Sequence, residues 1–163
     1  VCYLFFAFLL AYLLREKFTL GLLLLVLIIC IFTDLGGYIF GKVFKGPKLI
    51  KISPKKTYAG AIGGLVLSLV AALIYSQYTA TGTATFLNLS IWADITLNKI
   101  YLLFILVISL ISQIGDLIIS YFKRLAKVKD TGNLLPGHGG LLDRLDGIVF
   151  AIPFTYLMLS YLG

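Results

Sequence analysis

The stretch FTLGLLLLVLIICIFTDLGGYIF, residues 18–40, decides the fold class of this chain. Asp34 is its one charged residue, and its apolar residues do not alternate with polar ones. An α-helix needs about 20 mostly apolar residues to cross roughly 30 Å of hydrocarbon. A run of this length without a period of two predicts a membrane-spanning helix and not a barrel strand.

Other apolar segments flank this one, at residues 1–14, 59–78, 100–122 and 145–162. We therefore expect an all-α fold, a polytopic membrane helix bundle with about five transmembrane helices, the first of them short. The composition agrees, with 60% hydrophobic and 13% charged residues, against about 25% charged in soluble domains. We expect one transmembrane domain over residues 1–163. Since Val1 already lies in an apolar run, we expect a fragment that lacks N-terminal spans.

The basic residues are concentrated in two connections. Residues 41–58 and 121–144 hold eleven of the fourteen Lys and Arg residues. The positive-inside rule predicts that both connections are cytoplasmic loops, and five spans would place them on the same side. The net charge of +7 then requires no nucleic-acid partner. A simpler alternative is that these residues only fix topology and attract anionic lipids, at about 1 kcal/mol each.

A polar stripe is predicted along the fourth apolar segment. Its members recur at spacings of three and four residues: Gln113, Asp116, Ser120, Lys123 and Lys127. Ionisable groups inside a span cost several kcal/mol, so Asp34 and Asp116 are candidate functional residues. Alternatively, each carboxylate serves only as a helix–helix hydrogen-bond partner or as a counter-ion to a lysine. The stripe as a whole must face protein or a water-filled cavity.

Further carboxylates follow the stripe. Asp143 and Asp146 stand three residues apart, on one face if a helix begins there. Carboxylates that converge beside many cations can hold Mg²⁺ together with phosphate oxygens. One histidine and no cysteine cluster argue against a zinc site.

Two glycine-rich, basic loops could bind phosphate. Glycines surround His138, and ISPKKTYAGAIGG places Ser53, Lys56 and Thr57 just before a predicted helix, whose N-terminus favours anions. Arg124 and Arg144 could bind phosphate bidentately. For the glycines at 60, 63 and 64, close helix packing is the alternative use.

The run SYFKRLAKVKDTGNLLPGHGGLLDRLD, residues 120–146, resembles the signature of the phosphatidate cytidylyltransferase (CDP-diacylglycerol synthase) family, in its bacterial form. The segments DLGGYIFGKVFK, ISPKKT and QIGDLIIS resemble upstream elements of the same family. The resemblance therefore extends over most of the chain, which looks like the family's C-terminal catalytic portion.

The resemblance implies transfer of CMP from CTP to phosphatidate, with Mg²⁺ as cofactor and room for a second cation. It implies metal ligands at Asp116, Asp143 and Asp146, and catalytic roles for Asp116, Asp143, Lys123 and His138. The substrate-binding residues that it implies are Ser53, Lys56, Thr57, Ser120, Arg124, Lys129, Asp130 and Arg144. It also implies a homodimer in the bacterial inner membrane, with the active site facing the cytoplasm.

Two other classes of protein stay open. The first is another membrane CTP-dependent transferase or kinase, acting on an isoprenoid or archaeal diether lipid. The second is a non-enzymatic ion transporter subunit, in which Asp34 and Asp116 would line the ion path.

Overall fold

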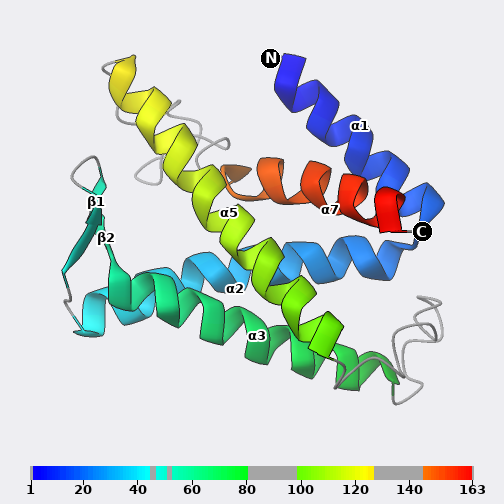
Figure 1. Cartoon of the computed structure of the whole chain (residues 1–163), viewed down its shortest axis with the longest axis horizontal. Helices are drawn as coiled ribbons and strands as arrows, with labels where there is room; N and C mark the ends of the chain where they lie inside the picture. The colour runs from blue at the N-terminus through cyan, green and yellow to red at the C-terminus, as the bar shows by residue number, and fades with distance from the viewer. Residues whose placement is uncertain (1, 45–46, 51–52, 81–98, 127–144, 163) are drawn as a thin grey trace, which may run out of the picture.

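The structure, a computed structural model, describes residues 2–44, 47–50, 53–80, 99–126 and 145–162. Over these residues the chain forms five α-helices and one β-hairpin (Figure 1). In chain order the elements are α1 (Cys2–Lys17), α2 (Leu20–Phe44), β1 (Lys48–Ile50), β2 (Ser53–Thr57), α3 (Tyr58–Ala80), α5 (Lys99–Leu125) and α7 (Ile148–Leu162). The predicted all-α membrane bundle is confirmed.

Three of the described helices are long and apolar enough to cross a membrane: Leu20–Phe44, Tyr58–Tyr78 and Lys99–Leu125. The other two, α1 and α7, have 16 and 15 residues, fewer than the about 20 that a full crossing needs. Of the about five expected spans, three thus meet the length requirement.

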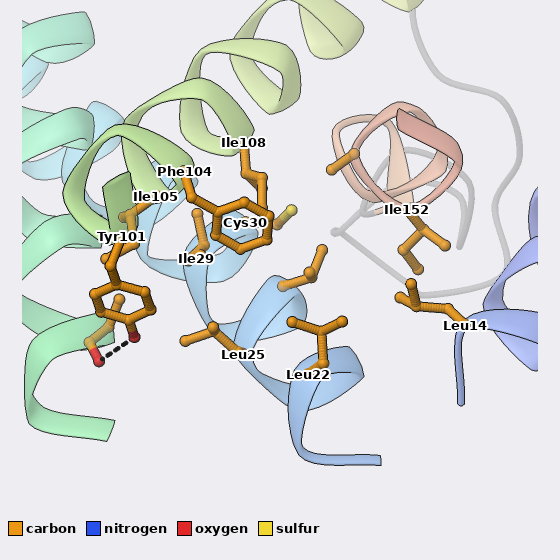
Figure 2. Packing of buried hydrophobic residues seen from close by; sticks show 13 residues of the cluster. Leu14, Leu22, Leu25, Ile29, Cys30, Tyr101, Phe104, Ile105, Ile108 and Ile152 are labelled. Atoms are coloured by element: carbon orange, nitrogen blue, oxygen red, sulfur yellow. Dashed lines mark hydrogen bonds between the residues drawn. The ribbon is translucent and has the colours of Figure 1, made fainter. Parts of the chain in front are cut away.

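Helix α2 lies at the centre of the bundle and packs against α1, α3, α5 and α7 (Figure 1). Figure 2 shows Leu22, Leu25 and Ile29 of α2 grouped with aromatic and aliphatic side chains of α5, while Leu14 of α1 lies near Ile152 of α7. This cluster excludes lipid as well as water, so close packing is what holds the helices together.

The outer surface is strongly apolar. On α3, four exposed aliphatic side chains recur every four residues, at Ile62, Val66, Val70 and Ile74. Such a stripe would be unfavourable against water, whereas acyl chains solvate it well. The described surface therefore suits a lipid environment.

The structure places regular elements in the ranges expected as loops. Helix α2 continues to Phe44, because apolar residues extend that far and Pro47 is the next residue that cannot donate a helical hydrogen bond. A two-stranded antiparallel hairpin follows, with Lys48 opposite Thr57. Helix α5 likewise continues to Leu125, beyond the expected loop start at residue 121.

Helices α2 and α3 approach so closely that their backbones touch. A Cβ added to Gly36 would lie 2.7 Å from the carbonyl oxygen of Gly63 and 2.9 Å from the Cα of Gly64. A Cβ added to Gly60 would lie 2.6 Å from the carbonyl oxygen of Gly37. The close-packing alternative for the glycines of α3 is therefore confirmed, and this contact fixes where β2 meets the bundle.

Substituting Gly36 by Ala should destabilise the bundle by about 1–3 kcal/mol, because the new methyl group meets backbone that cannot rotate away. The matched control is Gly37→Ala, where the nearest atom to the new Cβ is 3.8 Å away. That variant should stay within about 1 kcal/mol of the parent protein. Thermal unfolding in detergent measures both, and equal melting temperatures for the two variants would contradict the close contact.

Candidate active site at the end of the polar stripe

The polar stripe of α5 faces other parts of the protein. The Gln113 amide nitrogen Nε2 donates to the carbonyl oxygen of Ala61, in the first turn of α3, at 3.1 Å. Asp116 and Lys123, further along the same face, each contact a charged partner from another element. This is the environment that the spacing of the stripe predicts, since unpartnered polar groups in hydrocarbon are costly.

Asp116 forms an ion pair with Lys56 of β2. The two side chains are 31% and 27% exposed, so water can reach both. The pair joins the QIGD segment of α5 to the ISPKKT segment of the hairpin, about 60 residues earlier in the chain. The two motifs thus form one site, in which a carboxylate and an ammonium group lie side by side.

A second ion pair lies two helical turns further along α5. Lys123 Nζ is 2.6 Å from Asp146 Oδ2, and the two side chains are only 13% and 4% exposed. Asp146 lies two residues before α7, so the pair ties the end of α5 to the start of α7. A buried charge is tolerated only when it is paired, which makes each partner depend on the other. The metal-ligand role expected for Asp146 stays a prediction.

Thr57 caps the N-terminus of α3. Its Oγ1 accepts a hydrogen bond from the backbone N–H of Gly60 at 3.1 Å, and the N–H of Tyr58 donates to the carbonyl oxygen of Pro47 at 3.2 Å. The capped helix end lies beside Lys56, so the helix dipole and an ammonium group both favour an anion here.

The other predicted site residues divide between described and undescribed parts of the chain. Ser53 begins β2, Ser120 is half-buried on α5 between Asp116 and Lys123, and Arg124 is exposed in the last turn of α5. Five predicted residues lie outside the described residues: Lys129, Asp130, His138, Asp143 and Arg144. Within the described ranges, no group of three or more His, Cys, Asp or Glu side chains is placed to hold a metal ion.

A group of buried hydroxyls lies next to the stripe and was not predicted from the sequence. They are Thr33 of α2, Ser68 of α3 and Ser109 of α5, and the first two are each hydrogen-bonded to Ser109. The sequence did contain a pattern that indicates Ser109, because it precedes Gln113 by four residues and so continues the same helical face. Asp34, considered alongside Asp116, is exposed on α2 next to the buried Thr33.

Together these features define a helical membrane protein with a charged site where its helices meet a hairpin. A model of the cytidylyltransferase family matches residues 1–162, almost the full chain. The chain belongs to the cytidylyltransferase family.

Individual relatives are similar over most of this chain. The identity is 43% over 130 residues to a phosphatidate cytidylyltransferase of Bacillus subtilis, covering 78% of this chain and 43% of the relative. The identity is 41% over 143 residues to a phosphatidate cytidylyltransferase of Rickettsia conorii, covering 85% of this chain and 59% of the relative. It is 41% over 128 residues to one of Staphylococcus haemolyticus, covering 78% of this chain and 44% of the relative. The chain thus spans about half the length of these relatives.

The two ion pairs should differ in their effect on stability. Replacing Lys123 by Met removes the cation beside a buried carboxylate and should cost about 3 kcal/mol or more. Replacing Lys56 by Met breaks a pair that water already screens and should cost less than about 1 kcal/mol. Chemical unfolding of the two matched variants in detergent compares them. Equal destabilisation would contradict the difference in burial.

Proposed function

We propose that this chain carries the catalytic site of a phosphatidate cytidylyltransferase, which transfers CMP from CTP to phosphatidate and releases pyrophosphate. The observation that carries the proposal is the contact between Lys56 and Asp116, because it unites two family-like motifs in one charged site. The names of the relatives support the same substrate class.

The chemistry suits a site without a protein nucleophile. A phosphate oxygen of phosphatidate attacks the α-phosphorus of CTP, a new P–O bond forms, and the bond from that phosphorus to the pyrophosphate oxygen breaks. The protein must bring two polyanions together and stabilise the charge that develops on the leaving pyrophosphate. Lysines, an arginine and a helix N-terminus perform both tasks.

The described residues suggest how the work is divided. Lys56 and the capped start of α3 would bind phosphate from the hairpin side, while Arg124 would bind it at the end of α5. Lys123 would bind phosphate too, or else position Asp146, to which it is already paired. The remaining proposed contributors are Ser53, Thr57, Ser120, Lys129, Asp130, His138 and Arg144.

A divalent cation, which we propose to be Mg²⁺, fits part of this site. Asp116 offers hard carboxylate oxygens that are partly open to water, as Mg²⁺ prefers, and Asp143 would be its partner. Asp146 fits less well, because its carboxylate is almost fully buried against Lys123. When bound, the cation would neutralise phosphate charge and so lower the barrier to transfer.

The location and assembly follow from the same proposal. The acyl chains would stay in lipid beside the apolar helix surfaces, while the head group meets CTP at the charged end of the bundle. The concentration of Lys and Arg in the two connections, residues 41–58 and 121–144, supports a cytoplasmic orientation in a bacterial inner membrane. We propose a homodimer, as the family resemblance implies.

The test is a transfer assay with the protein in lipid vesicles. Labelled CMP from CTP should enter phosphatidate with release of one pyrophosphate for each product formed. Incorporation only into a polyprenyl or diether acceptor would replace this proposal with the related lipid enzyme. Ion flux without any transfer would favour the transporter.

Asp116→Asn should lower transfer by at least about 100-fold, because the amide removes the negative charge that orients Lys56 and would hold the cation. The control is Glu16→Gln, which makes the same chemical change at an exposed position on α1. It should leave transfer unchanged. Retention of full activity in Asp116→Asn would overturn the role of this carboxylate.

Removal of divalent cations with a chelator should abolish transfer, and Mg²⁺ should restore it. Calcium, which is larger and holds its ligands less regularly, should restore much less. The initial rate of pyrophosphate release is the measurement. Undiminished activity in excess chelator would exclude the proposed metal.

A further inference from the structure

Three hydroxyl groups meet where α2, α3 and α5 cross. Thr33, Ser68 and Ser109 are 1%, 0% and 0% exposed. Thr33 Oγ1 is 2.7 Å from Ser109 Oγ, and Ser68 Oγ is 3.1 Å from Ser109 Oγ. Each hydroxyl comes from a different helix, so the group, here called the hydroxyl junction, links three spans at one point.

The order of the hydrogen bonds follows from counting protons. Thr33 donates its one hydroxyl proton to the carbonyl oxygen of Ile29 at 2.7 Å. The short contact between Thr33 and Ser109 therefore uses the proton of Ser109. The one proton of Ser68 has two acceptors within reach, the carbonyl oxygen of Leu65 at 3.0 Å and Ser109 Oγ at 3.1 Å. Loss of the Thr33 oxygen removes the acceptor for Ser109, and a buried hydroxyl without a partner is costly.

The hydroxyl junction lies about two helical turns from Asp116. Ser109 precedes Gln113 by four residues and Asp116 by seven, all on one face of α5. A Cβ added to Gly64 would lie 2.7 Å from the Thr33 carbonyl oxygen and 3.2 Å from Gln113 Nε2. The same crossing of α2 and α3 thus contacts both the junction and the glutamine that leads to Asp116.

We propose that Thr33, Ser68 and Ser109 are positioning residues, which set the rotation of α5 so that Asp116 faces Lys56. Adjacent side chains lie about 100° apart around a helix axis. A rotation of α5 by part of that angle would therefore turn Asp116 away from β2. Apolar contacts along α5 contribute to this angle, but they are non-directional. A chain of directional hydrogen bonds constrains it more closely.

The chain offers a matched control in Thr155 of α7. Its hydroxyl also donates to the carbonyl oxygen four residues earlier, Ala151, at 2.7 Å, and its side chain is 0% exposed. Thr155→Val therefore removes the same local bond as Thr33→Val but leaves the hydroxyl junction intact. Thr33→Ser keeps the oxygen and should rescue the behaviour of the parent protein.

Two measurements are made on these three variants. The first is steady-state transfer, whose interpretation rests on the proposed function. Thr33→Val should lower kcat about tenfold while KM for CTP changes less than about threefold, because alignment is lost and not binding. Thr155→Val and Thr33→Ser should both remain near the parent values.

The second measurement does not depend on activity. In a background of Cys2→Ala and Cys30→Ala, the substitutions Lys56→Cys and Asp116→Cys are introduced, and the two thiols are joined by a short cross-linker in lipid. Adding Thr33→Val should slow the cross-linking several-fold, while adding Thr155→Val or Thr33→Ser should not. If transfer is absent in all variants, the cross-linking rates still decide this inference, while the proposed function fails. Equal cross-linking rates for Thr33→Val and Thr155→Val would overturn the positioning role of the hydroxyl junction.

Discussion

Polar side chains inside a hydrocarbon layer must find their partners within the protein, and this requirement organises the whole structure around α5. Between Ser109 and Asp116, the helix presents a hydroxyl, an amide and a carboxylate along one face. Each is met by a different element: the crossing of α2 and α3, the first turn of α3, and β2. In water these contacts would be optional, whereas in lipid an unpartnered hydroxyl or amide costs several kcal/mol. The helices therefore pack in the one arrangement that satisfies this face.

The glycine contact between α2 and α3 makes that arrangement possible. Because Gly36 and Gly60 carry no side chains, the two backbones approach until their atoms touch. Thr33 and Ser68 are thereby brought close enough to reach one serine of α5 together. This glycine contact lies next to the hairpin, so the packing of α2 against α3 also determines the position of Lys56. Site and fold share one set of interactions.

The sequence predicted what depends on local pattern. The all-α bundle follows from the length of the apolar runs, and the inward face of Gln113 and Asp116 follows from helical spacing. The hairpin was not predicted, because its short strands show no alternation of polar and apolar residues. Nor did the sequence indicate that Lys56 pairs with Asp116, since residue types and spacing carry no information about contacts between segments so far apart. For Lys123 and Asp146, the stripe indicated the helix face but not which carboxylate would meet it.

The unequal burial of the two ion pairs gives the site two kinds of electrostatic contact. Lys56 and Asp116 are hydrated, so dissolved ions screen their attraction and a polyanion can compete for the ammonium group. Lys123 and Asp146 are shielded from bulk electrolyte, so their attraction is nearly independent of ionic strength. One end of the stripe is thus exchangeable and the other is fixed. A dissolved anion can rearrange the first contact, while the second holds α5 against the start of α7.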